Sequence, residues 1–121
     1  MAEHLDSIAR INSLDGFWTA EFGSSAGMFG GGVAVFREGK VWGGDGLYYY
    51  VGEYDVKGNA FRATLKVTPF IEGSVSVFGT TGRDLTLELE GSFTEEGQAI
   101  AQGRPKEMPD LKFGVKLTKR C

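Results

Sequence analysis

The sequence has few of the residues on which catalytic and metal sites depend. It contains one histidine, His4, and one cysteine, Cys121, among 121 residues. A Ser-His-Asp or Cys-His arrangement needs a base beside its nucleophile, and a zinc site needs several converging ligands. Neither His4 nor Cys121 has a partner at such a spacing, and a single cysteine cannot form an internal disulfide. We therefore expect no catalytic residues, no metal, no cofactor and no enzymatic activity.

Basic clusters, long apolar runs and a secretory signal are missing as well. The 13 Lys and Arg residues are outnumbered by 16 Asp and Glu residues, and they are scattered except at 116–120. Because nucleic-acid binding requires clustered positive charge, we expect no nucleic-acid partner. No stretch approaches the roughly 20 apolar residues of a membrane helix, and the N-terminal segment does not resemble a signal peptide. We expect a cytoplasmic protein that does not contact membranes.

Glycines and aromatic residues are plentiful, and their spacing indicates a folded sheet. The chain has 19 Gly, 15 aromatic residues (2 Trp, 4 Tyr and 9 Phe) and 3 Pro. From residue 17 onward, apolar and polar side chains alternate with the period of two that is typical of β-strands. The expected strands span 17–23, 29–37, 40–43, 47–56, 61–68, 85–93, 98–103 and 113–117. The segment 74–78 is either a further short strand or part of a long connection.

About eight strands joined by short turns predict an all-β domain, either a sandwich or a barrel. We favour an antiparallel up-and-down barrel of the lipocalin type, because consecutive hairpins lead to meander pairing and interior glycines let strands bend. The barrel is expected to occupy residues 14–121 as a single domain. Residues 1–13 are expected to form a short helix or a partly ordered tail.

The tyrosine-rich segment 47–56 has two different faces. One face carries tyrosines and a glycine, whereas the other ends in two acids and is therefore expected to point outward. The inward face, together with the aromatic side chains of 17–23, predicts an interior that could hold a small amphipathic molecule. The candidate ligand-binding residues are Trp18, Phe22, Tyr48, Tyr50 and Tyr54. The alternative is that these rings fill a small barrel without leaving space.

The outward face of the same segment predicts an interface. Leu47, Tyr49 and Val51, with Phe17 beside them, would form an exposed apolar stripe. Such stripes mark protein contacts, and a twofold homodimer is the simplest use of one. Cover of this stripe by a neighbouring loop or by the N-terminal segment is the alternative.

Two glycine motifs, GMFGGGV (27–33) and GGDG (43–46), lack the residues of phosphate-binding or cyclic-dinucleotide sites and indicate bulges and a turn.

Three parts of the sequence carry a resemblance to a known family. They are FWTAEF (17–22), GGVAVFREGKVWGGDGLYYYVGEY (31–54) and the later alternating strands. The sequence resembles, over 16–119, the GrlR-type family of small regulatory proteins, named for the negative regulator of a bacterial type III secretion system. The resemblance implies a lipocalin-like barrel that forms homodimers. It also implies regulation by binding and sequestering a transcriptional activator.

One departure from that family concerns the loop after the GGD strand. The characterised regulator has the acidic run Glu-Asp-Glu-Asp there, whereas this chain reads DVKGN at 55–59. A loop with one acid and one lysine cannot present the same charge pattern to a basic partner. The expected function is therefore a non-enzymatic binding protein, with an apolar ligand inside, a protein partner outside, or both. A purely protein-binding regulator is the first alternative, and an enzyme that uses interior acids or tyrosines is the second.

Overall fold

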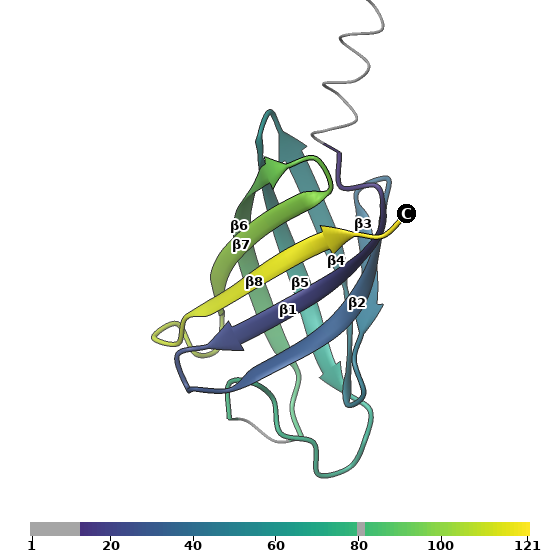
Figure 1. The fold of residues 1–121 in the computed structure, drawn as a ribbon. Helices are drawn as coiled ribbons and strands as arrows, with labels where there is room; N and C mark the ends of the chain where they lie inside the picture. Colours follow the sequence, from purple (N-terminus) through teal and green to yellow (C-terminus); the bar gives the residue numbers. More distant parts are fainter. Residues whose placement is uncertain (1–12, 80–81) are drawn as a thin grey trace, which may run out of the picture.

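The fold is a closed barrel of eight antiparallel strands, seen in a computed structural model that describes residues 13–79 and 82–121 (Figure 1). The strands are β1 (Gly16–Ser24), β2 (Phe29–Arg37), β3 (Lys40–Gly44), β4 (Tyr48–Lys57), β5 (Ala60–Pro69), β6 (Leu85–Glu95), β7 (Gln98–Pro105) and β8 (Phe113–Lys119). This confirms the expected all-β up-and-down barrel. The helix or tail expected at residues 1–13 lies, except for Ser13, outside the described part of the chain. Among the described residues, no helix is long and apolar enough to cross a membrane.

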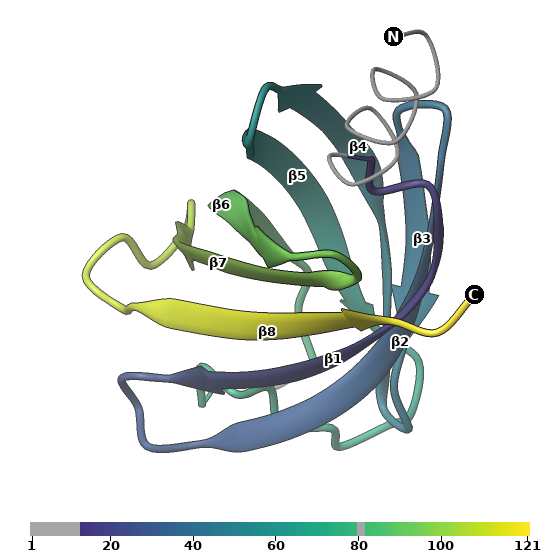
Figure 2. The same cartoon turned by 45° about the horizontal axis from the view of Figure 1, so that its top comes forward.

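The barrel closes because its first and last strands pair. β1 and β8 lie side by side (Figure 2), with partners running from Trp18 and Lys119 to Ser24 and Phe113. The backbone N–H of Phe17 adds a bond of 2.9 Å to the carbonyl of Cys121 just beyond the last pair. Closure leaves neither strand with an unpaired edge, which explains how a short sheet avoids edge-to-edge association.

Gly52 shows why the strands of so small a barrel need glycine. It faces inward on β4 opposite Leu65, and a Cβ atom built on it would lie 1.9 Å from the carbonyl oxygen of Thr64. No side chain fits in that space, so any other residue would force β4 and β5 apart. The close approach supports the expectation that interior glycines let the sheet curl.

The two ends of the barrel differ in their connections. The upper end in Figure 1 has the tight turns after β2, β4 and β6, such as Glu38-Gly39, where both residues have positive φ angles of 49° and 83°. The lower end has the turns after β1 and β3 and two longer connections, of which the structure describes 70–79 with 82–84 and 106–112. The segment 74–78 lies in the first of these long connections and forms no strand of its own.

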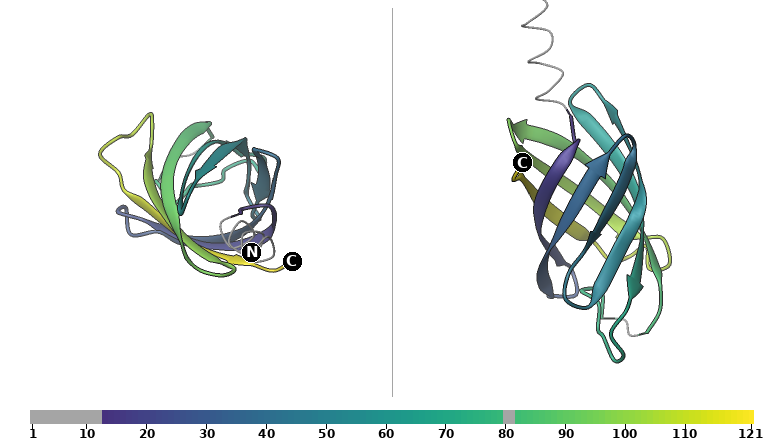
Figure 3. Two further views of the ribbon diagram at one scale, coloured as in Figure 1. Left: turned by 90° about the horizontal axis from the view of Figure 1, so that it is seen from above. Right: turned by 90° about the vertical axis from the view of Figure 1, so that its right-hand side faces the viewer.

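Seen along its axis, the barrel is a ring of strands around an apolar interior (Figure 3, left). The upper end of this interior is filled by packed rings. Trp18 meets Phe36 edge to face with ring centres 6.3 Å apart, and Phe61 meets Phe93 at 5.5 Å. Leu14, which precedes β1, is completely buried against this layer. The lower end is not filled in the same way.

Candidate functional site

The middle and lower part of the barrel encloses a cavity of about 460 Å³. Every strand contributes inward side chains to its lining, and most of these side chains are apolar. The space exists because four inward positions on four different strands carry only a methyl group. These residues are Ala20, Ala34, Ala63 and Ala101. A leucine or phenylalanine at each of these positions would fill a barrel of this size with side chains.

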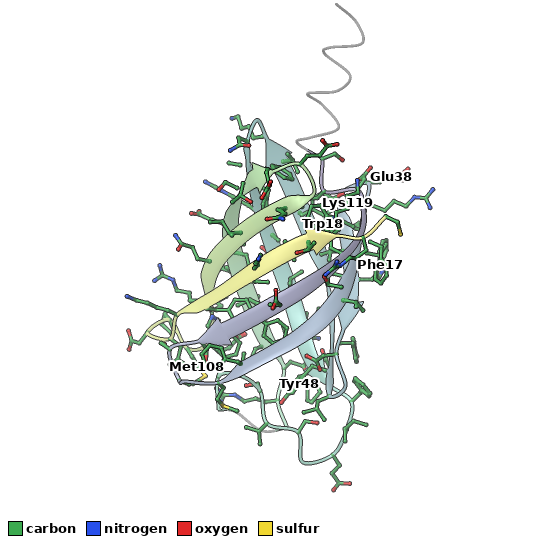
Figure 4. All side chains as sticks on the ribbon, viewed as in Figure 1. Phe17, Trp18, Glu38, Tyr48, Met108 and Lys119 are labelled. Carbon is green, nitrogen blue, oxygen red and sulfur yellow. The ribbon has the colours of Figure 1, made fainter. Side chains whose placement is uncertain are left out.

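Three of the five predicted ligand-binding residues line this cavity. Phe22 extends from β1 and packs against the Phe113 ring at 5.7 Å, whereas Tyr48 and Tyr50 extend inward from β4. Tyr48 is one-twentieth exposed and Tyr50 is half-buried. Figure 4 shows Tyr48 near the lower end of the barrel, where the long connections lie.

The other two predicted residues, Trp18 and Tyr54, do not line the cavity and lie toward the upper end. The Trp18 indole N–H donates a hydrogen bond of 2.7 Å to the carbonyl of Leu14, and Figure 4 places Trp18 well above Tyr48. The Tyr54 hydroxyl donates one of 2.6 Å to Asp15 Oδ1. Both bonds fasten the segment before β1 across the upper end, so these side chains close the barrel.

Asp45 is a cavity-lining residue that the sequence analysis assigned only to a turn. It sits between β3 and β4, where its Oδ1 atom accepts bonds of 2.8 Å from the backbone N–H groups of Leu47 and Tyr48. Its Oδ2 atom accepts a hydrogen bond from the hydroxyl of Tyr50. The GGDG motif therefore does form the expected turn, and the same turn brings a carboxylate to the cavity wall.

The Tyr50 hydroxyl reaches Asp45 over the backbone of Gly32. A Cβ atom at Gly32 would lie 2.9 Å from that hydroxyl oxygen and 2.7 Å from the carbonyl oxygen of Gly44. Burial raises the pKa of the Tyr50 hydroxyl well above its ordinary value, and the hydrogen bond to Asp45 and its charge raise the pKa further. Burial, followed by the Asp45 charge, also raises the pKa of Tyr48. Both phenols are therefore neutral at ordinary pH.

Residues 74–78 of the β5–β6 connection lie at the lower end of the barrel, where several contacts hold them. The Tyr48 hydroxyl donates a bond of 3.1 Å to the carbonyl of Ser74, and the Ser24 hydroxyl donates one to the carbonyl of Val77. The ring of Phe78 packs on Phe113 at 5.4 Å. These contacts cover part of the cavity with backbone and side chains of 74–78.

The rim of the cavity is apolar and exposed. Phe29 lines the cavity and is 84% exposed, and Leu47 and Val75 line it while remaining nearly half exposed. Large apolar side chains are costly to leave in water, so their grouping at one opening marks a place where an apolar molecule can enter. Leu47, predicted as an interface residue, thus belongs to this rim as well as to the outer surface.

Charge in the cavity is of one sign. Asp45 is the single acid among the described lining residues, and that part of the chain supplies no Lys, Arg or His to the lining. A pair of facing carboxylates, which general acid–base chemistry would use, is therefore not found in the described lining. Within 13–79 and 82–121, no three His, Cys, Asp or Glu residues are grouped so that they could hold a metal ion.

The predicted interface residues lie on the outside of the barrel in one continuous apolar patch. Phe17, Tyr49 and Val51 are 37–45% exposed, and neighbouring strands add further large apolar side chains to them. The register places Phe17 beside Val35, Val35 beside Trp42, and Trp42 beside Val51 across β1–β4. We define the β1–β4 patch as Phe17, Val33, Val35, Trp42, Tyr49 and Val51. The strands β1 and β2 and their neighbours face the viewer in Figure 3, right.

The opposite side of the barrel is polar. The outward side chains of β5–β8 are mostly charged or polar, and the large apolar side chain among them is Ile100. Examples of the polar set are Arg62, Lys66, Glu88, Glu90, Gln102 and Lys116. Val35 and Trp42 were not among the predicted interface residues, although their alternation with buried Phe36 and Val41 could have identified them.

No protein-family model matches this chain, and no curated protein matches its sequence significantly. The functional conclusion therefore depends on the geometry of the cavity and of the outer face.

Proposed function

We propose that the chain is a binding protein that holds a small apolar or amphipathic molecule inside its barrel. The observation that carries this proposal is the interior cavity of about 460 Å³. Ligand sites in proteins typically measure about 300–1,000 Å³ and combine apolar walls with a few polar groups. The walls here are mostly aliphatic and aromatic, and the polar side chains are Asp45, Tyr48, Tyr50 and Ser76.

The size of the cavity argues against a barrel that is simply filled by its own rings. Protein interiors are packed to a density of about 0.75, and voids larger than a water molecule are few. An apolar cavity of about 150 Å³ already binds benzene. Water in this larger cavity would find few hydrogen-bond partners on its mostly apolar walls, so an apolar molecule that displaces the water would be favoured.

A dye titration with two matched substitutions tests the proposal. We expect N-phenylnaphthylamine, a neutral dye that fluoresces in apolar sites, to bind the wild-type protein saturably with one site per chain. Ala101→Phe places a ring in the cavity and should weaken binding at least about tenfold, or about 1.4 kcal/mol. Ile100→Phe, on the outer face of the same strand, should leave binding unchanged.

Circular dichroism of both variants shows whether the barrel is intact, and Ala63→Phe offers a second way to fill the cavity from β5. The absence of saturable binding to the folded wild type would refute the proposal. So would equal weakening by Ala101→Phe and Ile100→Phe, because the dye would then be bound outside the barrel.

We further propose that two copies associate through the β1–β4 patch. A face with this many large apolar side chains resembles an interface core, and most soluble oligomers are symmetric. Charged residues of both signs border the patch on the same strands, among them Glu21, Arg37, Lys40 and Glu53. Lys40 and Glu53 already pair at 2.5 Å while remaining largely exposed. A border of mixed sign is suited to a second copy of the same surface.

A regulator that sequesters an activator is the second candidate function, and the same patch favours it. The resemblance to the GrlR-type family supports this reading, and the patch gives such a partner an apolar surface to bind. The turn after β4, at Gly58 and Asn59, has none of the acidic run associated with activator binding. A partner of this chain would therefore be recognised by different chemistry.

A further inference from the structure

The polar groups of the cavity are gathered at one place near its lower end. Asp45, Tyr48 and Tyr50 belong to one turn and the strand that follows it, and all three line the cavity. The described lining has one further polar side chain, Ser76 of the β5–β6 connection, whose hydroxyl oxygen accepts a bond of 3.1 Å from the backbone N–H of Phe78. Apart from glycines, the other lining residues are apolar. A ligand with one polar end would therefore be oriented with that end toward Asp45 and its apolar part toward the middle of the barrel.

The hydrogens of both phenols are already donated to the protein. Tyr50 gives its hydroxyl hydrogen to Asp45 Oδ2, and Tyr48 gives its hydrogen to the carbonyl of Ser74. A phenol has one O–H donor, so the oxygens of Tyr48 and Tyr50 can only accept another bond. The Asp45 carboxylate accepts as well. Asp45, Tyr48 and Tyr50 therefore offer a ligand only hydrogen-bond acceptors.

An anionic ligand would meet unfavourable electrostatics at the same place. Its charge would lie in a largely apolar cavity beside the carboxylate of Asp45, and the described lining contains no cationic side chain to pair with it. Like charges that are removed from water repel strongly, and an unpaired buried charge is costly. A hydroxyl or ammonium group would instead donate to the acceptors that are present, and a cation would gain from the charge of Asp45.

We infer that the cavity selects an apolar molecule whose polar end donates a hydrogen bond, such as a primary alcohol or amine, and that it rejects carboxylates of the same length. This inference depends on the proposed interior binding site and specifies its ligand class. Asp45 is the residue that sets the selectivity, with Tyr50 holding the carboxylate in place through its hydroxyl.

Isothermal titration of the full chain at neutral pH with decanol, decylamine and decanoate tests the inference. The three probes share one apolar chain and differ in the end group. We expect decanol and decylamine to bind with one site per chain, and decanoate to bind at least about tenfold more weakly than decanol, a difference of about 1.4 kcal/mol. Decanoate that binds as tightly as decanol to the wild type would overturn the inference.

Two substitutions assign the selectivity to its residue. Asp45→Asn keeps the size of the side chain and removes the charge, so it should bring decanoate to within about threefold of decanol and weaken decylamine. Asp55→Asn removes an exposed acid from the outer face of β4 and should leave all three affinities unchanged. A preference for decanol that survives Asp45→Asn would overturn the role of Asp45.

The titration also distinguishes failure of the proposed interior site from failure of the inferred ligand class. If none of the three probes binds and the dye N-phenylnaphthylamine does not bind either, the proposed interior site fails. If the dye binds and the three probes bind without discrimination, the interior site stands and the inferred ligand class fails.

Discussion

At the scale of single residues, one tyrosine strand performs two tasks at opposite ends of the barrel. Tyr48 and Tyr50 line the cavity beside Asp45, whereas Tyr54 bonds to Asp15 and helps to close the upper end. Burial, followed by the hydrogen bond to Asp15, raises the pKa of Tyr54 to about 12. The protein therefore favours the protonated form of this side chain more than an unfolded chain does.

Tyr54→Phe tests this closing contact. The substitution keeps the ring, which packs edge to face on Phe36 at 5.3 Å, and removes the hydroxyl. We expect the free energy of unfolding to fall by about 1 kcal/mol, the usual net value of one hydrogen bond. Urea denaturation at neutral pH measures this change. Because Tyr54 does not line the cavity, dye binding should not change.

The same variant predicts a difference in alkaline stability. A raised pKa means that the stabilisation from Tyr54 is fully present below pH about 10, the ordinary tyrosine pKa, and is lost as the pH rises toward 12. Wild-type stability should therefore decline across this window, and Tyr54→Phe should decline less steeply. Equal slopes for the two proteins would show that the hydroxyl of Tyr54 does not contribute.

The sequence predicted which side chains point inward but could not predict how deep along the barrel each would lie. Trp18 and Phe22 share one face of β1, yet only Phe22 lines the cavity. A period of two contains no information about position along the axis. The role of Asp45 was hidden for a related reason, because it depends on a hydrogen bond from Tyr50 that forms only once the turn is folded.

At the scale of strands, the outer faces of the two halves of the barrel differ in character. The β1–β4 patch is apolar, whereas the outward side chains of β5–β8 are mostly charged or polar. The alternation in the sequence predicted the individual strands and the outward position of Tyr49 and Val51. It did not reveal that Val35 and Trp42 join them, because that requires the register between β2, β3 and β4.

Val51→Lys tests the proposed association of two copies. Val51 lies in the β1–β4 patch, and a lysine there would become an unpaired charge in the interface, which costs about 3–5 kcal/mol. We expect the wild type to sediment as a dimer at micromolar concentration and Val51→Lys as a monomer.

Ile100→Lys is the matched control, since Ile100 has similar exposure on the polar side of the barrel. It should sediment as the wild type does. A wild type that remains monomeric would refute the dimer, and co-purification of a different protein that Val51→Lys abolishes would favour the sequestering regulator in its place.

At the scale of the whole molecule, the cavity is a joint property of strands that are far apart in the sequence. Ala20, Ala34, Ala63 and Ala101 are unremarkable one by one, and only the closed barrel turns them toward a common space. The barrel architecture could be predicted from the sequence, because strand alternation and turn signals are local. The volume of the cavity could not be predicted, because it depends on the register of all eight strands.

Binding inside the barrel is tested most directly by methyl NMR of the labelled protein during a titration with decanol. We predict saturable shifts for methyl groups that line the cavity, such as those of Leu87 and Val115, and none for the outward methyl groups of Val35 and Ile100. Interior shifts that saturate at one decanol per chain would place the ligand inside the barrel. Shifts confined to Val35 and its neighbours, or no shifts at all, would contradict the account.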